Sequence, residues 1–128
     1  MATVLRLLVV LGLLGSAWIH FDLWQLGYRD IDTIGPLFLV NVIAGAVLAI
    51  AVLVWRHWLP LLGAVGFGLA TLGGYLLSVT VGLFGMQNEL YWQAEPILAA
   101  VAELGCIVFG LAGVVMLRST ERAGVASR

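Results

Sequence analysis

Glu103 is the residue whose chemistry stands out, because it interrupts an almost entirely apolar run from 96 to 117. At ~1.5 Å per residue, a helix of that length crosses the hydrocarbon core of a bilayer. A carboxyl group at that depth needs a proton, a polar partner or water. We therefore expect Glu103 to serve in one of two ways. It is either a functional carboxylate that binds a proton, a cation or another ligand, or a protonated group that fixes helix packing through hydrogen bonds to Asn41, Ser78 or His20.

Four further polar side chains are expected at a similar depth in the other apolar runs. They are His20, Asn41, Tyr75 and Ser78. At ~1.5 Å per residue, each lies roughly 6–12 Å from the end of its run, and Glu103 lies ~10 Å from the corresponding end. The opposite half of every run is apolar and contains small residues. This asymmetry predicts a polar pocket toward one membrane surface, or an internal hydrogen-bond network, built around Glu103.

Metal, haem and nucleophile chemistry have little support in the sequence. Cys106 is the single cysteine, which excludes an intrachain disulfide and a cysteine-based metal cluster. The spacing of His20, Asp22 and Glu103 matches no metal motif, and His57 is expected at the opposite membrane surface. No nucleophile–base motif, phosphate loop or dinucleotide fingerprint is present. We therefore expect no catalytic residue, no metal and no cofactor.

The composition places the chain in a membrane. Of its 128 residues 62% are hydrophobic and 10% are charged, and the mean hydropathy is +1.10. A soluble domain of this size could not cover so much apolar surface with so few charges. A net charge of −1 gives no basis for nucleic-acid binding. The prediction is a single integral membrane domain over residues 1–128, with the lipid bilayer as its partner.

Four apolar runs predict four transmembrane helices and a polar C-terminal tail. The expected helices cover residues 4–24, 35–55, 59–83 and 96–117, and the tail at 118–128 is expected to fray. Pro36, Pro60 and Pro96 each fall in a first helical turn, where a missing N–H costs little. The loop between the second and third helices is very short, so these two helices are expected to be antiparallel neighbours. The predicted fold is all-α, a four-helix transmembrane bundle with up-down-up-down topology.

Small residues recur at helical spacing and predict the packing faces. Small side chains on one face allow another helix to approach closely. The most regular stripe, in the third helix, contains Gly66, Ala70, Gly74, Ser78 and Gly82. Packing positions are also expected on the first helix at Gly12 and Ser16 and on the fourth at Gly110.

The arginines predict the orientation, since the chain has no lysine. One side of the predicted bundle carries Arg6, Arg56, Arg118, Arg122 and Arg128, and the other side carries only Arg29. Cytoplasmic loops are rich in arginine and lysine, so both termini are expected in the cytoplasm. The polar pocket then faces outward, and the expected location is a plasma membrane of bacterial type, which the chain crosses several times.

Two functions are compatible with these patterns. The first is binding or translocation of a small cation, a proton or a lipophilic ligand in the outward-facing pocket. Four helices are few for a transporter, so translocation would require a homodimer. The second is a structural or assembly subunit of a larger membrane complex, without activity of its own. An intramembrane enzyme is the least favoured class. Glu103→Gln separates the first two functions. It should abolish the activity of a binding or translocating protein, whereas in an assembly subunit it should alter only stability or partner binding.

Overall fold

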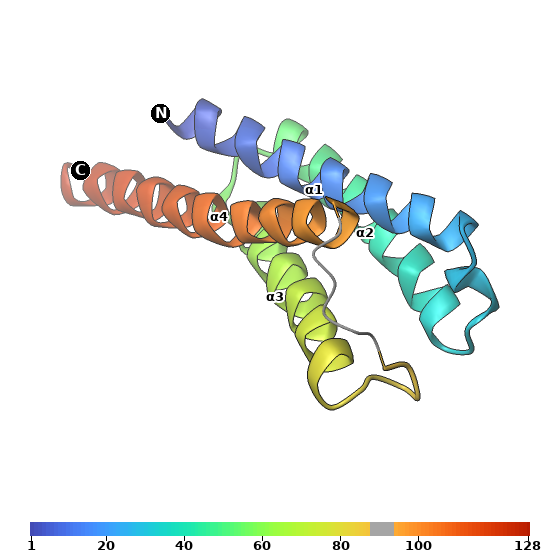
Figure 1. The fold of residues 1–128 in the computed structure, drawn as a ribbon. Helices are drawn as coiled ribbons and strands as arrows, with labels where there is room; N and C mark the ends of the chain where they lie inside the picture. The colour runs from blue at the N-terminus through green and yellow to red at the C-terminus, as the bar shows by residue number, and fades with distance from the viewer. Residues whose placement is uncertain (88–93) are drawn as a thin grey trace.

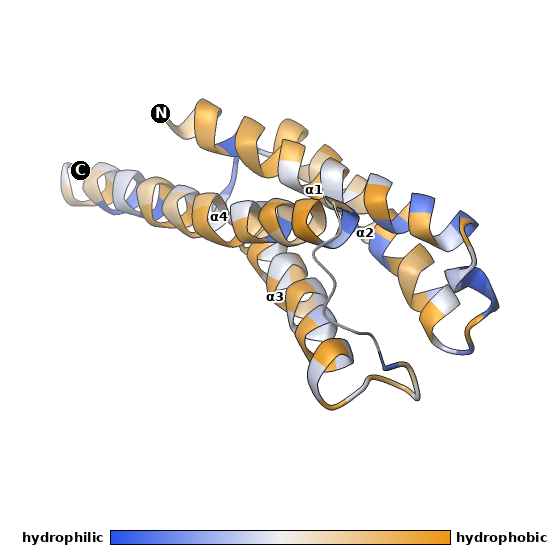
Figure 2. Cartoon of the chain, in the orientation of Figure 1, coloured by the Kyte–Doolittle hydropathy of each residue, from blue (hydrophilic) through white to orange (hydrophobic). Residues whose placement is uncertain are grey.

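The computed structural model describes residues 1–87 and 94–128, which fold into four α-helices and one short 3-10 helix (Figure 1). All four α-helices are long and apolar enough to span a membrane. Figure 2 shows hydrophobic residues along each of them and polar residues gathered near their ends. The predicted all-α membrane class is therefore confirmed. The elements are α1 (Ala2–Gln25), η1 (Tyr28–Asp30), α2 (Ile34–Val54), α3 (Trp58–Thr80) and α4 (Ala94–Ala126).

The helix bounds follow the predicted ranges closely except at the end of α4. This helix continues to Ala126 instead of ending at 117. Its polar end is held by two contacts with the start of α3. The guanidinium carbon of Arg118 lies 5.0 Å from the centre of the Trp58 ring, and Glu121 Oε1 lies 3.9 Å from His57 Nε2. A cation over an aromatic face and a polar contact at the helix end both favour the helical conformation over a frayed tail.

The helices are arranged with α1 and α4 at the centre. α1 packs along both α2 and α4, and α4 packs along α3, whereas α2 and α3 contact each other only sparsely. Figure 1 shows α3 sloping away from the other three helices. The short loop at 55–57 keeps the linked ends of α2 and α3 together. The helices predicted as antiparallel neighbours do contact each other, but α3 packs mainly on α4.

Glycines make the central contacts close. A Cβ atom added at Gly12 of α1 would lie 2.7 Å from the carbonyl oxygen of Ala102 and 2.9 Å from Cys106 Sγ on α4. A Cβ atom added at Gly110 of α4 would lie 2.8 Å from Val65 Cγ2 on α3. All three distances are shorter than the contacts that real Cβ atoms make, so any larger residue would push the helices apart. Gly12 and Gly110 therefore lie where helix backbones approach each other.

The regular small-residue stripe of α3 lies elsewhere. A Cβ atom added at Gly66 would meet nothing within 4 Å, and at Gly74 it would meet only Leu83 Cδ2 at 3.7 Å. Ala70 is exposed, and Gly82 follows the helix in a turn with a φ of +88°. The close helix packing predicted for this stripe is therefore not found in the described residues.

Another face of α3 makes the contact with α4. It contains Leu61, Ala64, Val65 and Gly68, all of them buried. Leucine and valine on this face make more van der Waals contacts with α4 than glycine and alanine can. This explains why this face of α3 is the one that packs. Recurrence every four residues shows which residues share a face, but it does not show which face is covered.

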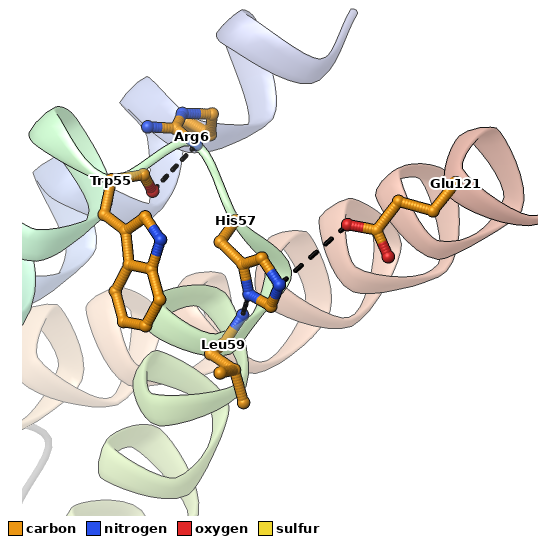
Figure 3. A network of polar contacts seen from close by, with 5 residues as sticks. All are labelled: Arg6, Trp55, His57, Leu59 and Glu121. Atoms are coloured by element: carbon orange, nitrogen blue, oxygen red, sulfur yellow. Dashed lines mark hydrogen bonds and ion pairs between the residues drawn. The ribbon is translucent and has the colours of Figure 1, made fainter. Parts of the chain in front are cut away.

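Polar contacts close the end of the molecule that holds both chain termini (Figures 1 and 3). Arg6 of α1 is only 8% exposed, and its guanidinium donates to the carbonyl oxygens of Val52, Leu53 and Trp55. These carbonyls belong to the last turn of α2, where no backbone N–H is available for them. A cation is also favoured at the negative end of a helix. Arg6 therefore acts as a C-terminal cap for α2.

In the same region, His57 links the start of α3 to the end of α4. Its Nδ1 accepts a hydrogen bond of 3.1 Å from the backbone N–H of Leu59 and so caps the start of α3. Its other ring nitrogen, Nε2, faces Glu121 near the end of α4 (Figure 3). The imidazole thus ties the loop between α2 and α3 to the polar end of α4.

Candidate functional site

A cavity of about 730 Å³ lies where α3 diverges from α2. Most of its wall comes from α2 and α3, with α1 and α4 contributing a smaller share, and the wall is mainly apolar. Small-molecule sites typically have volumes of ~300–1,000 Å³ and mostly apolar walls. The structure brings all five residues of the predicted pocket to this wall, together with part of the α3 stripe. These five are His20, Asn41, Tyr75, Ser78 and Glu103.

Glu103 projects from α4 and is almost completely buried, with an exposed fraction of 2%. Its Oε1 accepts a hydrogen bond of 3.2 Å from the hydroxyl of Ser16, which is fully buried on α1. The sequence suggested Asn41, Ser78 or His20 as partners, and the structure shows Ser16 in that place. Ser16 was predicted as a packing residue, and it contacts the carboxyl group because α1 and α4 lie so close at Gly12.

His20 continues this polar chain toward the end of α1. Its Nδ1 lies 2.9 Å from the carbonyl oxygen of Ser16 and 3.4 Å from the Ser16 hydroxyl. A carbonyl oxygen only accepts, so Nδ1 carries the hydrogen and Nε2 is the acceptor of a neutral ring. The imidazole packs edge-on against Phe38 at 4.9 Å, and Tyr28 stacks on the same phenyl ring at 4.9 Å. His20 therefore joins the Glu103 group to an aromatic cluster on the cavity wall.

Asn41 and Thr71 form a second polar group that bridges α2 and α3. The Thr71 hydroxyl donates to the Phe67 carbonyl at 2.8 Å, and its oxygen accepts from Asn41 Nδ2 at 3.1 Å. This leaves the amide oxygen of Asn41 as an acceptor. It is buried and has no hydrogen-bond partner among the described residues. Buried polar atoms are nearly always paired, so this oxygen marks a place where a partner is missing.

Tyr75 and Ser78 lie toward the end of α3. Ser78 is buried, and its hydroxyl donates to the carbonyl oxygen of Tyr75 at 2.7 Å. The predicted residues thus share one cavity, and the hydrogen bonds among the described residues join them in three polar groups. The groups are Glu103 with Ser16 and His20, Asn41 with Thr71, and Ser78 with Tyr75.

Three residues of this architecture were not assigned their role from the sequence. Ser16 was taken as a packing residue, and neither Thr71 nor Arg6 was given any polar role. A usable signal existed for Ser16 and Thr71, since each is a hydroxyl residue inside an apolar run. For Arg6 the signal was weaker, because an arginine near a helix start is also expected from membrane orientation alone.

The cavity wall is mainly apolar and carries few groups that can do chemistry. Within residues 1–87 and 94–128, no group of three His, Cys, Asp or Glu side chains could hold a metal ion. Glu103 is the one acidic residue on the described part of the wall. The wall therefore suits a molecule that has a small polar group and an apolar body.

Comparison of the chain with protein-family models, with curated proteins and with solved structures finds no match.

Proposed function

We propose that this chain is a membrane protein that binds a small lipophilic molecule in the cavity between α2 and α3. The observation that supports this function is the cavity itself, with its apolar wall and its few buried polar groups. Glu103 anchors the polar end of the ligand, and Asn41 and His20 supply further hydrogen-bonding groups. The remaining wall contacts the apolar body and keeps it out of water.

A lipophilic ligand is favoured over a bare cation or a proton. Metal cations such as Ca²⁺ take about six to eight oxygen ligands, and Glu103 is the one acid on the described wall. A proton or a small cation would also leave most of the volume of about 730 Å³ unfilled. An apolar molecule fills that volume and contacts the residues that actually line it.

We propose an up-down-up-down arrangement across a plasma membrane, with both termini in the cytoplasm. Five of the six arginines belong to the end of the molecule where Figure 1 places both termini, among them Arg122 and Arg128 near the C-terminus. There Arg6 contacts Trp55, the start of α3 contacts Arg118, and Arg56 lies in the loop between them. Arginine-rich ends face the cytoplasm. The polar cavity residues His20, Asn41, Tyr75 and Ser78 then lie in the outer half of the bilayer.

A role as an assembly subunit is the second candidate, and one observation favours it. Gly66 and Ala70 are exposed beside the cavity, and a Cβ atom at Gly66 would meet open space. Small residues on an open face allow a helix of another chain to approach closely. In that case the gap between α2 and α3 would be filled by a partner helix and not by a small molecule.

The test is to identify what the detergent-extracted protein retains, using native mass spectrometry. Ala70→Trp places a large ring in the cavity, and Leu69→Trp is the matched control because Leu69 is exposed and does not line it. We expect a bound small molecule on the wild type and on Leu69→Trp, and its loss from Ala70→Trp and from Glu103→Gln. A second protein retained by the wild type and by Glu103→Gln would support the assembly role instead.

A further inference from the structure

We infer that the ligand is a lipophilic amine, meaning a molecule with one positively charged nitrogen that carries N–H groups and an apolar body. This inference rests on the proposed function and narrows it. It depends on three properties of the cavity: the sign of its charge, the hydrogen-bond acceptor that lacks a partner, and the aromatic rings beside both.

Glu103 is the one group on the described wall that can carry a negative charge, and no arginine or lysine lies on that wall. Glu103 is buried there, and the described contacts give its carboxyl group one donor, the Ser16 hydroxyl. The chain has no lysine, and all six arginines are in the described residues, none of them on the wall. A buried carboxylate needs a compensating charge, and a cationic ligand supplies it. An anionic or zwitterionic headgroup would bring a phosphate for which the wall provides neither arginine nor lysine.

The unpaired acceptor is the amide oxygen of Asn41, a residue that is only 9% exposed. The hydroxyl hydrogen of Thr71 is used by the Phe67 carbonyl, so Thr71 can only accept from Asn41. The NH2 group of Asn41 must therefore face Thr71, and the amide oxygen has no donor among residues 1–87 and 94–128. A ligand that satisfies this oxygen must carry an N–H or O–H group.

Both features lie on the wall of the same cavity. A Cβ atom added at Gly68 of α3 would lie 2.6 Å from the carbonyl oxygen of Glu103. Thr71, which holds Asn41, follows Gly68 by about one helical turn, a rise of ~5 Å. The backbone of Glu103 and the hydroxyl that holds Asn41 therefore meet α3 about one turn apart, and both residues line the same cavity.

Aromatic rings complete the environment of a cation. Tyr28 stacks on Phe38, and His20 packs edge-on against the same phenyl ring. All three residues line the cavity. The faces of aromatic rings attract ammonium groups, most strongly where water is excluded. An ammonium group with N–H donors thus satisfies the carboxyl group, the amide oxygen and the rings, whereas a neutral alcohol satisfies the amide oxygen alone.

The test compares three ligands of equal chain length by calorimetric titration of the protein in phosphatidylcholine nanodiscs. Decylamine carries charge and N–H groups, decyltrimethylammonium carries charge without N–H groups, and decanol carries an O–H group without charge. We expect decylamine to bind tightest. Glu103→Gln should weaken both cations about tenfold or more and leave decanol unchanged. Asn41→Leu should weaken decylamine about threefold or more and leave decyltrimethylammonium unchanged.

Two controls separate the cavity from the membrane. Asp22→Asn removes an exposed acid of α1 that does not line the cavity, so it should change none of the three affinities. Ala70→Trp fills the cavity, so any binding that remains with this variant is partition into the bilayer. If decanol binds the wild type as tightly as decylamine and Ala70→Trp abolishes both, the amine assignment is overturned and the proposed function stands. If Ala70→Trp binds all three like the wild type, the proposed function fails as well. The ranking on the wild type needs no variant, so it decides the question even if Glu103→Gln does not fold.

Discussion

The Ser16 hydroxyl donates a hydrogen bond to Glu103 Oε1 across the contact between α1 and α4. One turn earlier, Gly12 lets the two backbones approach so closely that a Cβ atom would clash with Ala102. One turn later, His20 reaches back to the Ser16 carbonyl. The same face of α1 thus sets the distance between the helices and supplies the polar partner of the buried carboxyl group.

Ser16→Ala should destabilise the protein by about 1–3 kcal/mol, because it leaves a buried carboxyl oxygen without its donor. Unfolding in detergent, followed by circular dichroism, measures the loss. The matched control is Ser119→Ala on α4, since Ser119 is exposed and its hydroxyl donates only to the Val115 carbonyl. Equal stability of the two variants would contradict the role given to Ser16.

Arg6→Leu should lower the free energy of unfolding by about 1.5–3 kcal/mol, the range for hydrogen bonds made by charged groups. The variant removes the guanidinium that holds the last carbonyls of α2. Arg56→Leu is the matched control, because Arg56 is exposed in the adjacent loop. A chemical unfolding series in detergent compares both variants with the wild type. If the Arg56 variant loses as much as the Arg6 variant, the cap contributes nothing specific.

Two glycines of α3 should respond in opposite directions to alanine. Gly68→Ala should cost about 1–3 kcal/mol, since its Cβ atom would lie 2.6 Å from the Glu103 carbonyl oxygen. Gly66→Ala meets open space and should stabilise the helix by about 0.5–1 kcal/mol. Thermal melting of both variants checks the pair. Destabilisation by both would show that the Gly66 face is covered, as the sequence alone suggested.

The proposed orientation can be checked by cysteine labelling in intact cells on a Cys106→Ala background. We expect Asp30→Cys to react with a reagent that does not cross membranes, because Asp30 lies in the loop assigned to the outside. Val125→Cys should react only after permeabilisation. Labelling of position 125 from outside in intact cells would show that the orientation is the opposite of the proposed one.

Much of the fold follows from the sequence because long apolar runs have few alternatives in a membrane. The bounds of α1 and α2 are close to the predicted ones, since the polar residues near Arg29 and Arg56 end the apolar runs sharply. The end of α4 was missed because its stability depends on tertiary contacts with Trp58 and His57. Contacts between residues distant in the chain leave no local pattern to read.

The polar lining of the cavity was predictable by depth, whereas its partners were not. Glu103 and His20 were expected in one layer, and they do line one cavity. Which hydroxyl reaches the carboxyl group depends on the rotation of α1 about its axis, and the prediction assigned Ser16 only to packing. The divergence of α3 was also unpredictable, since the loop length fixes only how close the linked ends of α2 and α3 lie. The stripe at Gly66 therefore lies beside a cavity instead of in a contact.

The length of α4 has a consequence for how the protein sits in bilayers of different thickness. Its 33 residues extend ~50 Å, whereas the hydrocarbon core of a bilayer is ~30 Å thick. Arg118 contacts Trp58, and such arginine and tryptophan side chains hold a helix at a membrane surface. Glu103 lies ~22 Å farther along α4 from this level. A thicker bilayer would therefore place Glu103 deeper below the opposite surface, and a thinner one would bring it toward the headgroups. If the cavity binds the proposed ligand, the lipid environment thereby sets how far that ligand must travel to reach the carboxyl group.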